Sequence, residues 1–132
     1  MYKLEKPLYH GTSSASSVMI VGATGFKAPV YLTEDRRAAE HYAKAATAYL
    51  IYLCKEKDTH PITDGYSIFT FTSVPDENYL IVDDYSDEEP GQWKYLKSIR
   101  GLRHFTVERY PFDPDEEELM RLVCFAIGMW RK

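Results

Sequence analysis

The chain contains few of the residues that hold small proteins together covalently or through a metal. It has two cysteines in 132 residues, Cys54 and Cys124, and they lie far apart in the sequence. Neither has a second cysteine or a histidine at the spacing of zinc ligands, so neither a disulfide framework nor a zinc site is expected. We expect both cysteines to be buried free thiols in a reducing compartment.

Long apolar runs are also missing. No stretch approaches the roughly 18 residues that a membrane-spanning helix needs, and the N-terminal sequence MYKLEKPLYHGT lacks the apolar region of a secretory signal. Glycine and proline, seven of each, are near average usage, which excludes collagen-like and low-complexity architectures. The sequence therefore predicts one domain over residues 1–132, a cytoplasmic location and no membrane partner.

An excess of positive charge is missing as well. The formal net charge is −4 and the pI is about 5.5, which argues against general nucleic-acid binding through bulk electrostatics. Acidic residues concentrate in positions 76–89, and basic residues follow as the series Lys94, Lys97, Arg100 and Arg103. This series could bind phosphates or an acidic surface of a target. It could equally be a solvated face, which is the more common case for a run of charges.

The remaining composition, 45% hydrophobic with 14% aromatic residues, suffices for one core. Helical spacing predicts a short helix over 15–21, a long helix capped by Thr33 that ends before Lys55, and a last helix capped by Asp113 with a buried apolar stripe that begins at Leu119. Aromatic and β-branched residues predict a short strand that ends at Tyr9 before a turn, and further strands over 30–32, 66–72, 79–82 and 105–110. This order of elements indicates an α+β fold.

A histidine followed by glycine stands at the end of the first expected strand, in the sequence Tyr-His-Gly-Thr at positions 9–12. Glycine allows a ligand to approach the backbone closely. A neutral imidazole can donate one hydrogen bond and accept another, which suits a ribose hydroxyl. His10 is therefore a candidate ligand-binding residue. The alternative is that it is a turn residue that hydrogen-bonds only its own loop.

Two tyrosines form a second candidate group. Tyr31 ends an expected strand, and Tyr42 lies about two turns into the following helix. Two such rings can sandwich a flat ligand, and a cationic ring would add cation–π attraction to stacking. Both tyrosines could equally be core aromatics, above all Tyr42, which lies on the apolar stripe of its helix.

Together these motifs resemble the ADP-ribosyltransferase superfamily. The shared pattern is His-Gly-Thr on a first strand, Tyr-hydrophobic-Thr about twenty residues later, and a helix with Ala-Ala-x-x-Tyr-Ala. It is similar to the branch of diphtheria-type toxins and poly-ADP-ribose polymerases, and closest to the small rifampin ADP-ribosyltransferases. The resemblance covers residues 8–44, is diffuse over 66–110 and does not reach the last helix. It implies a compact split β-sandwich with flanking helices, and NAD bound between two small sheets.

The resemblance also implies roles for individual residues. His10 would bind the adenosine ribose of NAD, and the backbone of Gly11 would contact the nicotinamide amide, with Thr12 in the same turn. Tyr31 would stack on nicotinamide, and Tyr42 would pack on the ring as a second tyrosine. Together with NAD as co-substrate, these residues would form the donor site.

The acid that completes the triad of the family is less well marked in this chain. Asp83 and Asp84 follow the expected strand at 79–82, and Glu108 lies inside the strand at 105–110. The order of strand and acidic turn is more like the rifampin type, so Asp84 is the first choice, Asp83 the second and Glu108 the third. Each of them could also be an ordinary solvated acid.

The chemistry explains why an acid is needed. Cleavage of the nicotinamide–ribose bond builds positive charge on the sugar, and a carboxylate facing C1 stabilises that charge. The resulting prediction is a mono-ADP-ribosyltransferase that modifies a protein acceptor, with a nucleic-acid acceptor left open, as in a toxin, an effector or a phage-borne enzyme. Two alternatives stand beside it: a catalytically inactive binding module with this fold, and an enzyme like RNA 2′-phosphotransferase.

Overall fold

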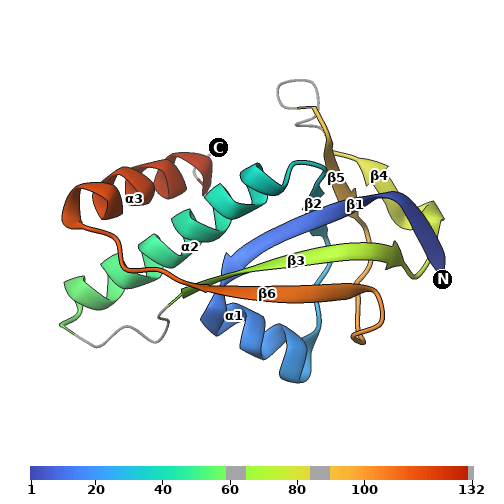
Figure 1. Ribbon diagram of the computed structural model, residues 1–132, viewed down its shortest axis with the longest axis horizontal. Helices are drawn as coiled ribbons and strands as arrows, with labels where there is room; N and C mark the ends of the chain where they lie inside the picture. Colours follow the sequence, from blue (N-terminus) through green and yellow to red (C-terminus); the bar gives the residue numbers. More distant parts are fainter. Residues whose placement is uncertain (59–64, 84–89, 131–132) are drawn as a thin grey trace.

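The computed structural model describes residues 1–58, 65–83 and 90–130, and these residues form a mixed α+β fold (Figure 1). The strands are β1 (Tyr2–Ser13), β2 (Val30–Thr33), β3 (Gly65–Val74), β4 (Leu80–Val82), β5 (Gln92–Tyr95) and β6 (Phe105–Pro111). The helices are α1 (Ser14–Met19), α2 (Arg36–Glu56) and α3 (Glu116–Trp130), with a π-helical turn η1 (Ile20–Thr24) and a 3-10 turn η2 (Glu77–Tyr79).

The strands of the described residues form one antiparallel sheet with the order β4-β5-β2-β1-β3-β6. The strands are least extensively paired in the middle of the sheet, between β1 and β2. Strands β1 and β2 both lie wholly within the described residues, and a single register pair, Tyr9 with Thr33, joins them. The neighbouring strands are joined over longer registers, as from Leu8 to Ser13 between β1 and β3. The sheet therefore consists of two three-stranded halves with a narrow junction.

Helix α2 packs directly on the backbone of β1. A Cβ atom added to Gly11 would lie 1.9 Å from the carbonyl oxygen of Ala39 and 2.9 Å from Cβ of Ala43, so only glycine allows this approach. Helix α1 lies on the opposite face, where Oγ of Ser17 is 2.9 Å from Oγ of Ser67 on β3. Figure 1 shows α2 and α3 on one side of the sheet and α1 on the other.

Three apolar clusters among the described residues stabilise this arrangement. The largest lies on the α1 face and centres on Phe26, Phe69 and Phe71, all of them buried. A second cluster joins α2 to α3, and a third joins α2 to β3 through Ala43 and Ile68. Burial of this apolar surface is the main favourable contribution to folding.

Several expectations from the sequence are confirmed. The fold is α+β, the long helix and the strands around 66–72 and 105–110 are present, and a short strand occupies Val30–Thr33. The apolar stripe of α3 is buried at four positions: Leu119, Leu122, Val123 and Ala126. Within the described residues, no helix combines the length and the apolar character that crossing a bilayer requires.

Other expectations are wrong at the level of strand and helix ends. The expected turn at residues 11–14 is largely strand, because β1 continues to Ser13 through pairing with β3. Asp35, not Thr33, caps α2, since its carboxylate accepts from the amide of Arg37, and the helix continues past Lys55 to Glu56. Asp115, not Asp113, accepts from an amide in the first turn of α3. Strand β5 was not anticipated.

Both cysteines were expected to be buried, and neither is. Cys54 is half-buried on α2 and Cys124 is exposed on α3. Cys124 directly follows the buried residues Leu122 and Val123, and one further residue along a helix turns the side chain by about 100°, to the exposed face. Cys54 lies six residues beyond Ala48, the last buried position of α2.

Replacing Gly11 with alanine tests the close packing of α2 on β1. We expect Gly11→Ala to lower the free energy of unfolding by at least about 2 kcal/mol, because the added methyl group overlaps the backbone of α2. The matched control is Gly128→Ala in α3, where an added Cβ meets no atom within 4 Å. Helix propensity predicts a gain of up to about 1 kcal/mol there. Urea denaturation followed by circular dichroism measures both, and equal stabilities for the two variants would contradict this packing.

Candidate functional site

The junction between β1 and β2 brings His10 and Tyr31 together. The imidazole Nδ1 of His10 lies 2.8 Å from the main-chain carbonyl oxygen of Tyr31. A carbonyl can only accept, so Nδ1 carries the proton and Nε2 has a free lone pair. The ring of His10 packs edge-on against Phe26, with a centroid distance of 5.1 Å. Where β1 and β2 separate, the hydrogen bond from the side chain of His10 to Tyr31 thus connects the two strands in place of a main-chain hydrogen bond.

The environment of His10 favours the neutral imidazole. Burial lowers its pKa below the ordinary value of 6.5, and this effect outweighs the hydrogen bond to the carbonyl of Tyr31, which acts in the opposite direction. Near neutral pH the side chain is therefore an uncharged donor at Nδ1 and an acceptor at Nε2.

Tyr31 offers an open aromatic surface. Its side chain is 54% exposed, although it stands in the middle of a strand between the buried residues Val30 and Leu32. The exposure arises because α2 begins just after β2 and covers β1 and β3, which leaves the half-sheet of β2, β5 and β4 open on that face (Figure 1). In the register of β2 and β5, Lys94 is the direct partner of Tyr31.

Polar side chains share this open face with Tyr31. Thr33 pairs with Gln92 across β2 and β5, and Nε2 of Gln92 donates to Oγ1 of Thr33 at 3.0 Å. The amide of Asp83 donates to the carbonyl of Gln92 at 2.9 Å, which extends the β4–β5 register by one residue. Alternation along the strands then places Asp83, Gln92 and Tyr31 on one face. Asp84, the acid chosen first from the sequence, lies outside the described residues.

Glu108 lies in a different environment. It stands on the edge strand β6, where its carboxylate accepts from the hydroxyl of Tyr110 at 2.6 Å and pairs with Arg36 at 3.5 Å. These interactions lower the pKa of Glu108, with the hydrogen bond from Tyr110 as the largest cause. Two strands, β3 and β1, separate β6 from β2, so the structure does not bring Glu108 together with Tyr31.

The other residues of the expected donor site, Gly11, Thr12 and Tyr42, contact other parts of the protein. The Cα of Gly11 faces α2, and this packing by itself explains the glycine. Thr12 pairs with Ser67 inside the sheet. The ring of Tyr42 stacks on Phe125 of α3, with centroids 6.1 Å apart, so an aromatic partner of Tyr42 comes from α3.

Two polar residues of this region, Gln92 and Glu34, were not singled out from the sequence as site residues, and Lys94 was named only as part of the basic series. Gln92 and Lys94 belong to β5, and their position beside Tyr31 follows only from strand pairing. Glu34 follows β2, and its carboxylate accepts from Nε1 of Trp93 at 3.0 Å and pairs with Lys6. The hydrogen bond from Trp93 is the main cause of the lowered pKa of Glu34. The one sequence signal for β5 was the alternation of polar and aromatic residues in Gln-Trp-Lys-Tyr, which is typical of a strand.

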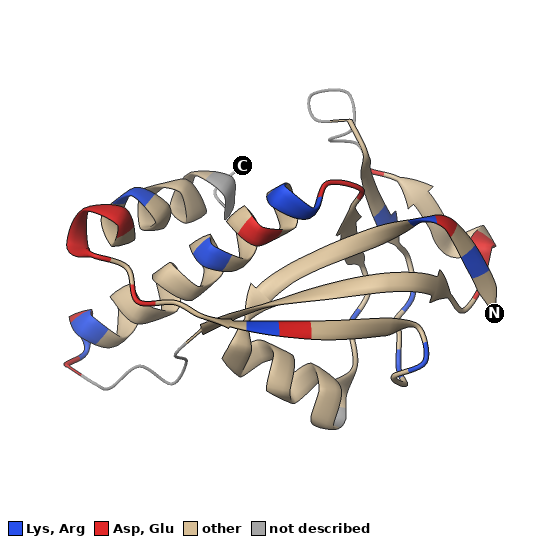
Figure 2. Ribbon diagram, viewed as in Figure 1, with Lys and Arg blue, Asp and Glu red and all other residues tan. Residues whose placement is uncertain are grey.

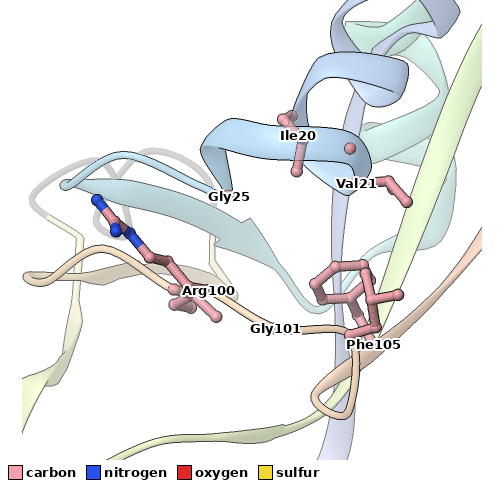
Figure 3. Close-up of a pocket in the computed structure, with 9 residues that line it drawn as sticks. Ile20, Val21, Gly25, Arg100, Gly101 and Phe105 are labelled. Atoms are coloured by element: carbon pink, nitrogen blue, oxygen red, sulfur yellow. The ribbon is translucent and has the colours of Figure 1, made fainter.

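The described residues also contain a cavity of about 120 Å³ between η1 and the segment that leads into β6 (Figure 3). Neither His10 nor Tyr31 lines it. It is separated from His10 by Phe26, whose ring contacts both His10 and Phe105. No group of three or more potential metal ligands occurs in the described part of the chain.

Comparison of the chain with models of protein families, with curated proteins and with solved structures found no match.

The tautomer and pKa of His10 can be measured directly. We expect proton–nitrogen correlation spectra to show a proton on Nδ1 of His10 and a pKa below 6.5, because burial opposes the imidazolium. The same histidine in urea provides the unfolded reference near 6.5. Since the folded pKa is the lower one, the contribution of His10 to stability is present above about pH 6.5 and declines as the pH falls toward the folded pKa. A proton on Nε2, or a folded pKa above the reference, would contradict the geometry.

Proposed function

We propose that this protein is a mono-ADP-ribosyltransferase that uses NAD and modifies a protein acceptor. The observation that carries the proposal is the contact of His10 with Tyr31. At the narrow junction of the sheet, Nδ1 of His10 lies 2.8 Å from the main-chain carbonyl oxygen of Tyr31, so residues of two separate sequence motifs meet there. The ring of Tyr31 remains open to a ligand.

The two halves of the sheet support the fold that the resemblance implies. A split β-sandwich needs two small sheets that separate at the ligand site. The halves β4-β5-β2 and β1-β3-β6 are joined by one register pair, directly beside His10 and Tyr31. In the proposed complex, nicotinamide stacks on the exposed ring of Tyr31. The imidazole of His10 lies on the opposite face of the sheet, against Phe26, and holds the main-chain carbonyl of Tyr31 in place.

The proposed reaction breaks the bond between C1 of the ribose and the nicotinamide nitrogen. The bonding electron pair stays on nitrogen, so nicotinamide leaves as a neutral molecule and needs no general acid. Positive charge develops on the ribose, and a carboxylate near C1 stabilises it more strongly than the ground state. A nucleophile of the acceptor then bonds to C1 and loses its proton.

Asp84 is the proposed carboxylate and Asp83 the second choice. Asp83 follows β4 on the open face that carries Tyr31, which supports an acid from this segment. Glu108 has no part in the proposal, because it is engaged by Arg36 and Tyr110 on the β6 edge.

Binding of NAD tests the proposed donor site. We expect saturating NAD to raise the melting temperature, since a ligand at a hundred times its Kd adds about 2.7 kcal/mol. Tyr31→Ala should weaken NAD binding by about tenfold, through lost stacking and cation–π attraction. Tyr31→Phe retains the ring and should bind NAD like the wild type. Met120→Ala, which truncates an exposed side chain on α3, controls for surface truncation.

Two results would contradict this function. If NAD at millimolar concentration neither shifts the melting temperature nor releases nicotinamide, the protein is better explained as a binding module. If the protein instead removes a 2′-phosphate from RNA in the presence of NAD, the reaction class is that of RNA 2′-phosphotransferase.

Substitution of the three acids identifies the carboxylate. We expect Asp84→Asn to slow nicotinamide release by about a hundredfold, the scale on which one preorganised electrostatic group contributes to catalysis. Asp83→Asn should slow it less. Glu108→Gln should leave it within about threefold of the wild type and serves as the matched control. Nicotinamide release by chromatography measures all three, and a large loss only in Glu108→Gln would refute this choice.

A further inference from the structure

The cavity between η1 and the β5–β6 segment belongs to a surface that the proposed chemistry does not use. Its walls include the apolar side chains of Ile20, Val21, Leu102 and Phe105 together with three glycines, and Arg100 also lines it. In Figure 3 the side chains of Ile20, Val21 and Phe105 stand around the opening, while the guanidinium of Arg100 extends away from Phe105. A volume of about 120 Å³ is close to the roughly 150 Å³ of an engineered cavity that holds benzene.

Large apolar side chains are exposed on the elements that form the cavity. Leu102, itself a lining residue, is 58% exposed. Val18 and Met19 do not line the cavity, but they are 54% and 63% exposed at the end of α1, which continues directly into the cavity wall at η1.

The charge around the cavity has one sign. Residues 14–33 and 90–107 contain no aspartate or glutamate, although the chain as a whole has a net charge of −4. Lys27, Arg100 and Arg103 are exposed, and they form no ion pair with the other described residues. Figure 2 shows blue and no red along the segment between β5 and β6.

The cavity is also held in place by the core beneath it. Phe26 and Ile99 form an antiparallel bridge with two hydrogen bonds, of 2.8 Å and 2.9 Å, and both side chains are buried. This bridge ties the end of η1 to the β5–β6 segment. A site preformed in this way spends little binding energy on ordering.

We propose that this surface binds a segment of a partner protein that carries one apolar anchor residue flanked by aspartate or glutamate. The anchor occupies the cavity, and the flanking carboxylates pair with Lys27, Arg100 and Arg103. The exposed Val18, Met19 and Leu102 cover the apolar side of the segment. A cavity sized for one side chain favours a peptide over an anionic membrane, since a membrane surface binds amphipathic elements without a preformed cavity.

Selection from a phage-displayed library of random decapeptides tests this proposal. We expect a consensus with one apolar residue between acidic ones, and synthetic consensus peptides should bind the protein in fluorescence anisotropy. Arg100→Glu combined with Arg103→Glu should weaken binding at least tenfold. The matched control, Arg37→Glu with Arg121→Glu, makes the same change in net charge at exposed positions on α2 and α3 and should leave the affinity unchanged.

A larger side chain at the cavity wall tests the anchor separately from the charge. Gly22 lines the cavity, and a Cβ added there meets no atom within 4 Å, so Gly22→Leu adds bulk at the wall without a clash at the Cβ atom. We expect this variant to retain its melting temperature and to lose at least tenfold in peptide affinity. An apolar-to-serine change in the consensus peptide should have an equal effect on the wild type.

Three outcomes would overturn the proposal. They are a selection without an acidic and apolar consensus, an affinity that is equal in the Arg100/Arg103 variant and its control, and binding to phosphatidylserine vesicles but to no selected peptide. Millimolar NAD should leave peptide affinity unchanged, because His10 and Tyr31 lie outside the cavity. If the protein shows no NAD-dependent activity but binds the selected peptides, the proposed function fails and the peptide-binding proposal stands.

Discussion

The packing of α2 against the backbone of β1 determines which part of the sheet is covered and which part stays open. Gly11 has no side chain, and Ala39 and Ala43 have small ones, so the helix approaches the strand until a single added carbon would overlap it. The helix then lies over β1 and β3 and leaves the other half of the sheet uncovered. Tyr31 is exposed for this reason, although its neighbours along β2 are buried.

The same packing separates two surfaces with different physical properties. On the α2 face, the open half-sheet presents an aromatic ring with Gln92, Lys94 and Asp83 near it, which suits a flat polar ligand. On the other face, the aromatic cluster around Phe26 supports both His10 and the cavity at η1. Phe26 therefore links the proposed donor site to the proposed partner surface without belonging to either.

The candidate site could be predicted only in part. The motifs around His10 and Tyr31 are local, and a short stretch of sequence shows each of them. The position of the acid depends on strand pairing: Asp83 shares a face with Tyr31 because β4, β5 and β2 are neighbours. Strand β5 has only four residues, and its alternation is too short to predict a strand or its neighbour, so Gln92 and Lys94 could not be placed beside Tyr31 from the sequence.

Local patterns along the chain predict the α+β class, the long helix and the buried stripe of α3, because periodicity and turn residues act over a few positions. Three contacts follow only from how the elements pack: Gly11 faces a helix, Glu108 pairs with Arg36, and His10 bonds the carbonyl of Tyr31. Each of these contacts joins residues far apart in the chain. They depend on strand order and on the side of the sheet that a helix covers, which no local pattern encodes.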